Sequence, residues 1–392
     1  MNIGIDATCW WNNRGFGRFT RELLTALFEL ESPHTYYVFT DQSIPALAAF
    51  GNVRVVEVPA SRPTTVAAVA DGNRSLQDMW RMSRAVAAAP LDLMFFPTVY
   101  SWYPVPWKLP TMLTLMDAIA ERYPRLIFPH WKSRLFWNIK VKGAVLTSQR
   151  ILTISNAAKA EVMEYIGVDA DRIDICSAAP SPEFRHITDR TCMDEARSRA
   201  GLPLGAPFLL YVGGLAPHKN LLGLLEGFEK ALAARDLGDI RLAIVGDFDG
   251  GGFHSNYESL LARVSASDVL SQRVHFTGFV PDEDLVALYS DATAAAMPSF
   301  SEGFGLPAIE ALACNTPLLA SQNTAFAEVA GDAGIYFDPF DPASISDAIV
   351  RVVCDEQLRN RLAKNGLTRA MEYTWPRAAR LALDYLEDMS AA

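Results

Sequence analysis

Short apolar runs alternate with longer amphipathic runs along most of this chain. The apolar runs are four to six residues long and suit buried strands, whereas the longer runs repeat apolar residues at the helical period. Strands are expected at Asn2–Ala7, Tyr36–Thr40, Val53–Val58, Leu91–Phe96, Met112–Leu115, Ile151–Ser155, Arg172–Cys176, Phe208–Val212, Arg241–Gly246, Val274–Phe279, Ala294–Met297 and Leu318–Ser321. Helices are expected at Arg21–Leu30, Leu76–Ala88, Ala157–Ile166, Asp282–Asp291, Leu306–Ala313, Ser344–Tyr373 and Pro376–Met389, with a loop at Tyr336–Pro342. This alternation predicts an α/β fold with parallel, doubly wound sheets, which bind ligands beyond the carboxyl ends of their strands.

One stretch, Ala178–Gly205, interrupts the alternation with prolines and glycines around a short charged helix. A chain of 392 residues is too long for one ordinary core, so this stretch is the expected domain boundary. We therefore predict a first domain over residues 1–185 and a second over residues 207–375.

The net charge of −10 is uneven, with a balance of +2 through Arg185 and −12 in the remainder. An acidic second half argues against nucleic acid, whose phosphates need a basic surface. The five cysteines are scattered, which indicates neither a disulfide framework nor a zinc site. The first strand begins almost at Met1, and no apolar run approaches the roughly 18 residues of a membrane-spanning helix. A cytoplasmic protein is therefore expected.

The run Pro298–Pro317 joins a predicted strand to a predicted helix through a short glycine-containing turn. Gly303 and Gly305 allow the backbone to approach a ligand, and the helix start that follows favours a phosphate. Glu302 lies in this turn and Glu310 one helical turn inside, so both can point toward the same ligand. The alternative is a buried turn with two solvated glutamates.

Two further glycine turns follow predicted strands. Gly213 and Gly214 precede Lys219 and Asn220 at a helix start, where Lys219 is a candidate diphosphate clamp or a solvated lysine. In the first half, Gly15, Phe16, Gly17 and Arg18 form a candidate phosphate or acceptor loop, for which a plain tight turn is an equal alternative. Asp117 lies just beyond the end of another predicted strand.

These motifs resemble those of the retaining glycosyltransferases of family 4. Glu302–Pro307 with Glu310 is similar to the E-x7-E signature of that family, and Gly213 through Asn220 is similar to its G-x-L-x-x-x-K-[GN] motif. The resemblance implies the GT-B fold, in which two doubly wound Rossmann-like domains face a central cleft. It also implies that the last helix, about 376–392, crosses back to the first domain.

The implied activity is transfer of a hexose, with retention, from a UDP- or GDP-sugar to a saccharide or lipid-linked oligosaccharide acceptor in polysaccharide biosynthesis. The resemblance assigns catalytic roles to Glu302, Lys219 and Asp117. It assigns donor binding to Gly213, Gly214, Lys219, Asn220, Gly278, Phe279, Val280, Gly303, Phe304, Gly305, Leu306 and Glu310. Neither a metal nor another cofactor is expected, because the leaving diphosphate itself assists attack on the same face.

Two positions depart from the family pattern. Met116 stands where the family has histidine, and Gly214 stands where many members have arginine. A nucleotide-sugar-binding protein without transfer activity therefore remains an alternative, as does a GT-B sugar-nucleotide epimerase. The string Asp247–Asp249 has the D-x-D form of a metal site but is interpreted as a solvated loop.

Two stretches of the first half suit a surface role. Residues 97–110 are rich in aromatics and prolines and predict either an acceptor platform or a rigid packed loop. The segment 130–150 carries five Lys/Arg, no acidic residue and three aromatics. It suits a helix lying peripherally on an anionic membrane, although we favour a surface helix whose Trp and Phe face the core.

Overall fold

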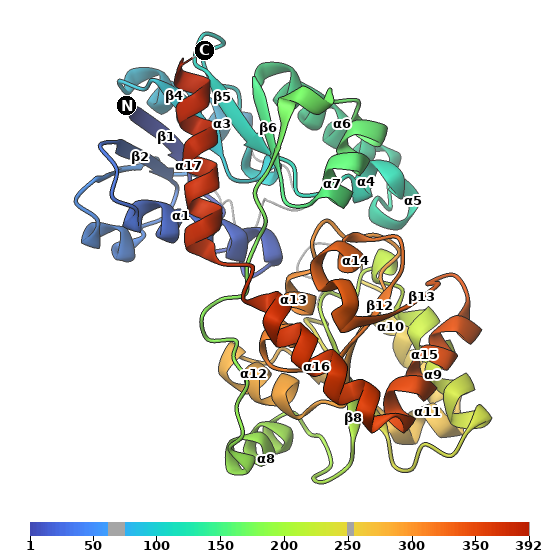
Figure 1. Cartoon of the computed structure of the whole chain (residues 1–392). Coiled ribbons are helices and arrows are strands. Elements are labelled where there is room, and N and C mark those ends of the chain that lie inside the picture. Colours follow the sequence, from blue (N-terminus) through green and yellow to red (C-terminus); the bar gives the residue numbers. More distant parts are fainter. Residues whose placement is uncertain (62–74, 249–254, 392) are drawn as a thin grey trace. The chain divides into compact units, whose positions relative to one another are not determined.

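The chain folds into two compact units (Figure 1). The computed structural model describes residues 1–61, 75–248 and 255–391. One unit comprises Met1–Ala178 and Thr374–Ala392, and the other comprises Ala179–Tyr373. The sequence placed residues 179–185 in the first domain and left residues 186–206 between the domains, whereas the structure includes both stretches in the second unit.

The described part of the first unit is built on a seven-stranded sheet in the order β3-β2-β1-β4-β5-β6-β7. All of its pairings are parallel, as the alternation of strands and helices predicts. The strands are β1 (Asn2–Asp6), β2 (Thr35–Thr40), β3 (Val53–Glu57), β4 (Leu93–Phe96), β5 (Thr111–Thr114), β6 (Arg150–Thr153) and β7 (Ile173–Ile175).

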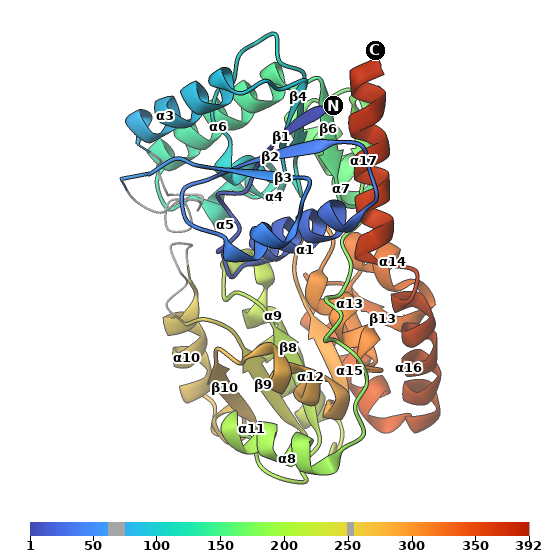
Figure 2. The ribbon, with the colours of Figure 1, turned by 90° about the vertical axis from the view of Figure 1, so that its left-hand side faces the viewer.

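Helices cover this sheet. They are α1 (Gly15–Glu29), α3 (Leu76–Ala88), α4 (Ile119–Arg122), α5 (Pro124–Ile127), α6 (Trp131–Thr147), α7 (Asn156–Glu161) and α17 (Trp375–Ala391). The C-terminal α17 belongs to the first unit, where it packs against α1 (Figure 2). Phe19 of α1 meets Trp375 edge to face, with ring centroids 5.8 Å apart.

The first helix begins at Gly15, six residues earlier than the sequence pattern indicates. Gly17 explains the difference, because a Cβ there would lie 2.1 Å from the carbonyl oxygen of Asn12. The chain therefore folds back closely on itself and enters the helix at once. The predicted phosphate loop at residues 15–18 is thus the first turn of α1.

The described part of the second unit is built on a six-stranded parallel sheet in the order β10-β9-β8-β11-β12-β13. Its strands are β8 (Phe208–Val212), β9 (Arg241–Val245), β10 (Val274–Gly278), β11 (Ala294–Met297), β12 (Leu318–Ser321) and β13 (Gly334–Phe337). The last of these was not predicted, because its four residues carry only two buried apolar side chains, Ile335 and Phe337.

The helices of the second unit are α8 (Arg190–Arg199), α9 (Leu221–Ala234), α10 (Tyr257–Ser265), α11 (Asp268–Arg273), α12 (Asp282–Asp291), α13 (Leu306–Ala313), α14 (Ala325–Ala330), α15 (Pro342–Cys354) and α16 (Glu356–Ala370). Their apolar faces and the central strands form one core, which includes Leu225 and Phe228 of α9 and Leu242 of β9. Each unit is therefore a Rossmann-like α/β domain.

Candidate functional site

The carboxyl ends of the second sheet are formed by glycines that pack backbone against backbone. The Gly213 N–H donates to the Val245 carbonyl (3.0 Å), and the Gly246 N–H donates to the Gly278 carbonyl (3.1 Å). A Cβ on Gly246 would lie 2.3 Å from the Gly213 oxygen, so no larger residue fits there without movement. Gly278 has a φ of +77°, which favours glycine. Three neighbouring strands thus end at glycines, and the absence of side chains there allows a ligand to approach the backbone closely.

Asn220 holds three of the loops at this edge together. Its Nδ2 donates to the carbonyl oxygens of Pro298 (3.1 Å) and Pro339 (2.7 Å), which follow β11 and β13. The residue is 7% exposed and has a φ of +55°, a conformation that asparagine tolerates better than most residues. Both of these bonds are made to the protein's own backbone, so Asn220 ties the loops of this edge together.

Lys219, the residue before Asn220, meets Glu302 across two loops. The Lys219 Nζ lies 2.5 Å from Glu302 Oε1, and the Ser299 hydroxyl donates to the same oxygen at 2.8 Å. The side chains of Lys219 and Glu302 are 23% and 14% exposed, so both remain accessible to a ligand. The structure therefore brings together two candidates that are separated by 83 residues in sequence.

The helix α13 begins next to this ion pair. Gly305 precedes it with a φ of +88°, and a Cβ there would lie 2.3 Å from the Phe326 ring, so glycine is required on both grounds. No side-chain hydrogen bond caps the start of α13. The N–H groups of Ala308 and Ile309 donate to the Gly305 carbonyl (2.9 and 3.4 Å), so the positive end of the helix dipole, more than free donors, would favour an anion there. Glu310 lies within α13 and is 3% exposed, so it is buried rather than solvated.

The other predicted donor-side residues differ in how far their side chains are exposed to solvent. Val280 and Phe304 are buried, and Phe304 packs edge to face on Tyr373 at 5.5 Å, which gives it a packing role. Phe279 is 72% exposed immediately after Gly278. Phe300 and Phe340 stack with centroids 4.7 Å apart, and Phe340 is also exposed. This stacked pair was not predicted, because its members lie 40 residues apart in the sequence.

His218 and Tyr211 are further groups at this edge that the sequence analysis missed. Burial, assisted by the charge of Lys219, lowers the pKa of His218 to about 3, so this imidazole is neutral near pH 7. Its Nδ1 has no hydrogen-bond partner among the described residues. The Tyr211 hydroxyl donates to the Gly214 carbonyl at 2.6 Å, and burial raises its pKa well above the usual value. The position of His218 beside the motif lysine was the available signal for it.

The first-unit candidates gather at the carboxyl edge of their own sheet. Phe16 stacks on Tyr100 with centroids 4.6 Å apart, and Met116 packs with both around Cys9. The Asp117 carboxylate accepts the Ile119 N–H at 3.1 Å, which turns the chain after β5. Met116, at the position where the family has histidine, thus belongs to a small apolar cluster.

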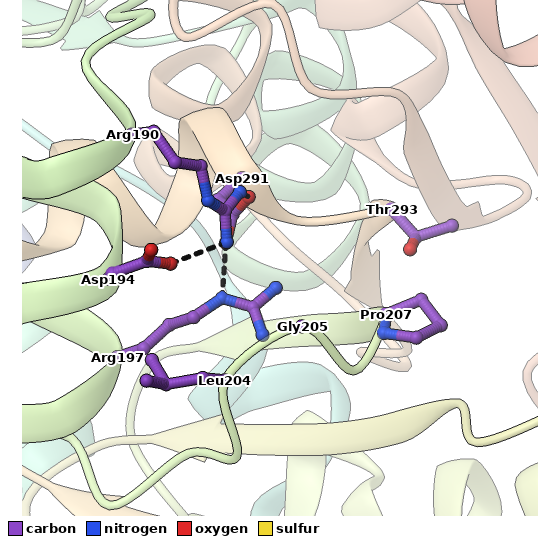
Figure 3. Close-up of a pocket in the computed structure, with 8 residues that line it drawn as sticks. All are labelled: Arg190, Asp194, Arg197, Leu204, Gly205, Pro207, Asp291 and Thr293. Atoms are coloured by element: carbon purple, nitrogen blue, oxygen red, sulfur yellow. Dashed lines mark hydrogen bonds and ion pairs between the residues drawn. The ribbon is translucent and has the colours of Figure 1, made fainter.

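A pocket of about 460 Å³ lies elsewhere in the second unit (Figure 3). It is bordered by Pro207 and Thr293, which precede β8 and β11, so it lies at the amino ends of these strands. Arg190 bonds Asp194 (2.6 Å) and Asp291 (2.5 Å), and Arg197 also bonds Asp291. These bonds tie α8 to α12, which explains why the segment predicted as a boundary belongs to this unit.

Metal-ligating groups do not converge in the part of the chain that the structure describes. No group of three His, Cys, Asp or Glu side chains is arranged to hold a metal ion there. Asp249 of the D-x-D string lies outside the described residues. The described helices also include none that is long and apolar enough to cross a membrane.

Comparison with known proteins agrees with this geometry. Residues 193–369 match the model of a family described as glycosyl transferases group 1. The chain is 30% identical over 248 residues to O-antigen chain mannosyltransferase B of Escherichia coli. This match covers 63% of the chain and 62% of that protein, so the chain spans less than two thirds of its relative.

Solved structures share the fold over the whole chain. Sucrose-phosphate synthase of Thermosynechococcus elongatus superposes with a TM-score of 0.73 at 18% identity, covering 100% of both chains. Anabaena HepE in complex with UDP-glucose superposes with a TM-score of 0.70 at 17% identity, covering 99% of this chain and 100% of the other. The fold is therefore of the GT-B type, and residues 193–369 are similar to glycosyl transferases group 1.

Proposed function

We propose that this protein transfers a hexose from a nucleoside-diphosphate sugar to a saccharide or lipid-linked oligosaccharide acceptor, with retention of anomeric configuration. The observation that carries the proposal is the cluster of Lys219, Glu302 and Ser299 beside the start of α13. A cation, a carboxylate and the positive end of a helix dipole there suit such a donor, which carries a diphosphate and sugar hydroxyls. The relative named as a mannosyltransferase and the neighbour bound to UDP-glucose support the choice of donor class.

Each residue of this site would have its own role in the proposed reaction. Lys219 would neutralise charge that develops on the leaving diphosphate, a type of interaction that contributes about 3–4 kcal/mol to transition-state stability. Glu302 would accept hydrogen bonds from sugar hydroxyls, and the backbone at Gly303–Gly305 would donate to sugar or phosphate. Glu310 would accept from the ribose. Phe279, exposed after Gly278, would lie beside the base.

In the proposed reaction the bond between the anomeric carbon and the diphosphate oxygen breaks while the acceptor oxygen bonds to the same face of that carbon. The departing diphosphate takes the acceptor's proton, so the step needs neither a protein base nor a protein nucleophile. The expectation of metal-independent transfer follows, because Lys219 and the start of α13 supply the positive charge. We place Asp117 and the first turn of α1 on the acceptor side.

Nucleotide release from a panel of UDP-, GDP- and ADP-sugars, measured in EDTA with and without saccharide acceptors, tests the proposal. The expected result is release from one donor, with retained configuration in the product and a loss of about 10²–10³-fold in kcat/KM for Lys219→Ala. Lys230→Ala is the matched control, because Lys230 is an exposed lysine of α9 that is not part of the cluster. An unchanged rate in Lys219→Ala would refute the assigned role.

Glu302→Gln separates binding from transfer. The substitution removes the carboxylate that pairs with Lys219, so donor affinity is expected to stay or rise while kcat falls. A donor that raises the melting temperature but is never turned over would instead indicate a binding protein. Conversion of the donor sugar without any acceptor would indicate an epimerase.

A further inference from the structure

Helix α6 carries apolar side chains on two opposite faces. Trp137, Val141 and Ala144 are buried against the sheet of the first unit, as any covering helix requires. At 100° per residue, Trp131, Leu135, Ile139 and Leu146 lie on the roughly opposite side. They are 71%, 47%, 60% and 85% exposed. The sequence interpretation that the Trp and Phe face the core is therefore wrong for Trp131 and for Phe136, which is 56% exposed.

Two neighbouring segments add exposed tryptophans. Helix α3 and the segment 97–110 contribute to the same apolar cluster as α6, through Met82, Trp102 and Trp137 among others. The Ser83 hydroxyl of α3 donates to the Pro104 carbonyl at 2.5 Å, which joins two of them. Trp80 of α3 is 59% exposed, and Trp107 of the segment is 80% exposed.

The charge on these three segments is almost wholly positive. Residues 76–88, 97–110 and 131–147 contain seven Lys/Arg and a single acidic residue, Asp78, which is 3% exposed. Each exposed tryptophan lies near a cation, since Arg84, Lys108 and Lys132 are 5.4–6.0 Å from the rings of Trp80, Trp107 and Trp131. None of these three cations has an ion pair among the described residues. The protein as a whole has a net charge of −10, so this concentration of cations is local.

We propose that the exposed side of α6, with Trp80 and Trp107, docks on the surface of an anionic lipid bilayer. Apolar side chains mixed with Lys and Arg, and tryptophans at the margin, suit the boundary between headgroups and acyl chains. The charge complementarity selects anionic lipid over a neutral bilayer, because each cation near such a surface strengthens binding about fivefold. The proposal concerns only the first unit and does not depend on transferase activity.

Flotation of the full chain with vesicles tests the proposal. Vesicles of phosphatidylglycerol and phosphatidylcholine are compared with vesicles of phosphatidylcholine alone, at low and high salt. The chain is expected to float with the anionic vesicles at low salt only. The fluorescence should shift to the blue on binding, since all eight tryptophans lie in the first unit. No flotation with anionic vesicles, or equal flotation with both kinds, would overturn the proposal.

Paired substitutions locate the surface. Trp131→Ser/Ile139→Ser is expected to lower the vesicle partition coefficient about tenfold or more, and Lys132→Gln/Lys142→Gln about 25-fold. The matched controls are Val269→Ser/Met371→Ser and Lys230→Gln/Lys364→Gln, which change exposed residues of the second unit and should leave partition unchanged. Thermal melts show whether each variant is still folded. Lys132→Gln/Lys142→Gln tests the surface without removing any apolar side chain.

Two results would overturn the assignment of this surface to lipid. If the control pairs lowered partition as much as the α6 pairs, the surface would not be responsible. If light scattering showed a dimer that Trp131→Ser/Ile139→Ser converts to a monomer, a second copy of the chain would be the occupant instead.

Discussion

Replacing Asn220 with alanine tests whether one amide holds the donor-side loops in place. The side chain is 7% exposed, and its Nδ2 bonds the carbonyls of Pro298 and Pro339 at 3.1 and 2.7 Å. Alanine removes the donor and leaves both carbonyls without this partner. It also places a residue other than Asn or Gly at a φ of +55°.

The free-energy cost follows from these two effects. An unsatisfied buried polar group costs about 1–1.5 kcal/mol at the lower end of measured values, and there are two of them. The left-handed conformation adds about 1 kcal/mol for alanine. Together they predict that Asn220→Ala lowers the free energy of unfolding of the second unit by about 3–4 kcal/mol.

Two other substitutions separate the contribution of the lost hydrogen bonds from that of the left-handed backbone. Asn220→Gly removes the hydrogen bonds but accepts the positive φ, so about 2–3 kcal/mol of the loss should remain. Asn315→Ala is the matched control, because Asn315 has a φ of +64° and no side-chain hydrogen bond among the described residues. It should cost only about 1 kcal/mol.

Urea unfolding provides the assay, with two probes. Tryptophan fluorescence reports only the first unit, which contains all eight tryptophans, whereas far-UV circular dichroism reports both. With a urea dependence of about 2 kcal/mol per molar, the second-unit transition of Asn220→Ala should move down by about 1.5–2 M. A shift no larger than that of Asn315→Ala would show that the two bonds contribute nothing. A shift confined to the fluorescence transition would refute the assignment to the second unit.

Further predictions concern His218, Gly305 and Arg197. The pKa of His218 is near 3 when folded and about 6.5 when unfolded, so stability is lost as pH falls below 6.5, by up to about 2 kcal/mol at pH 5. His218→Leu should flatten that pH dependence in urea titrations, and an unchanged slope would contradict the burial argument. Gly305→Ala should cost more than 2 kcal/mol and weaken donor binding in calorimetry, because its Cβ meets Phe326. Gly167→Ala, which is also left-handed but has open space around its Cβ, should cost about 1 kcal/mol. Arg197→Met leaves the Asp291 carboxylate without one partner and should cost about 3 kcal/mol in melts without changing donor affinity.

The sequence predicted the strands of both sheets well because parallel strands are buried on both faces. Runs such as Phe208–Val212, and the residues that follow Arg241 in β9, are therefore apolar without interruption and easy to locate. The start of α1 was misplaced because it depends on the contact between Gly17 and the Asn12 backbone, which no local pattern records. The assignment of α8 depended in the same way on distant partners, since Arg197 pairs with Asp291 nearly one hundred residues later.

The sequence identified Lys219, Asn220 and Glu302 individually but not their relation. Spacing places each residue at a strand end, and parallel sheets bring strand ends together, so a shared edge was predictable. Which cation pairs with which carboxylate depends on loop conformations that Asn220 itself fixes, through carbonyls 78 and 119 residues away. Asn220, expected to bind the donor, thus also joins the loops that carry Lys219 and Glu302.

The pairing of Lys219 with Glu302 bears on how a donor would bind. An ammonium bonded to a carboxylate at 2.5 Å is already neutralised, so an incoming diphosphate competes with Glu302 for it. If the sugar hydroxyls then donate hydrogen bonds to the released Glu302 carboxylate, the donor satisfies both members of the broken pair: its diphosphate binds Lys219 and its sugar binds Glu302. A nucleoside diphosphate that lacks the sugar would leave Glu302 uncompensated and should bind more weakly than the intact donor. Glu302→Gln should reduce the difference in affinity between the intact donor and the nucleoside diphosphate, because glutamine carries no charge that has to be compensated when the pair breaks. Calorimetry with both ligands would measure this difference.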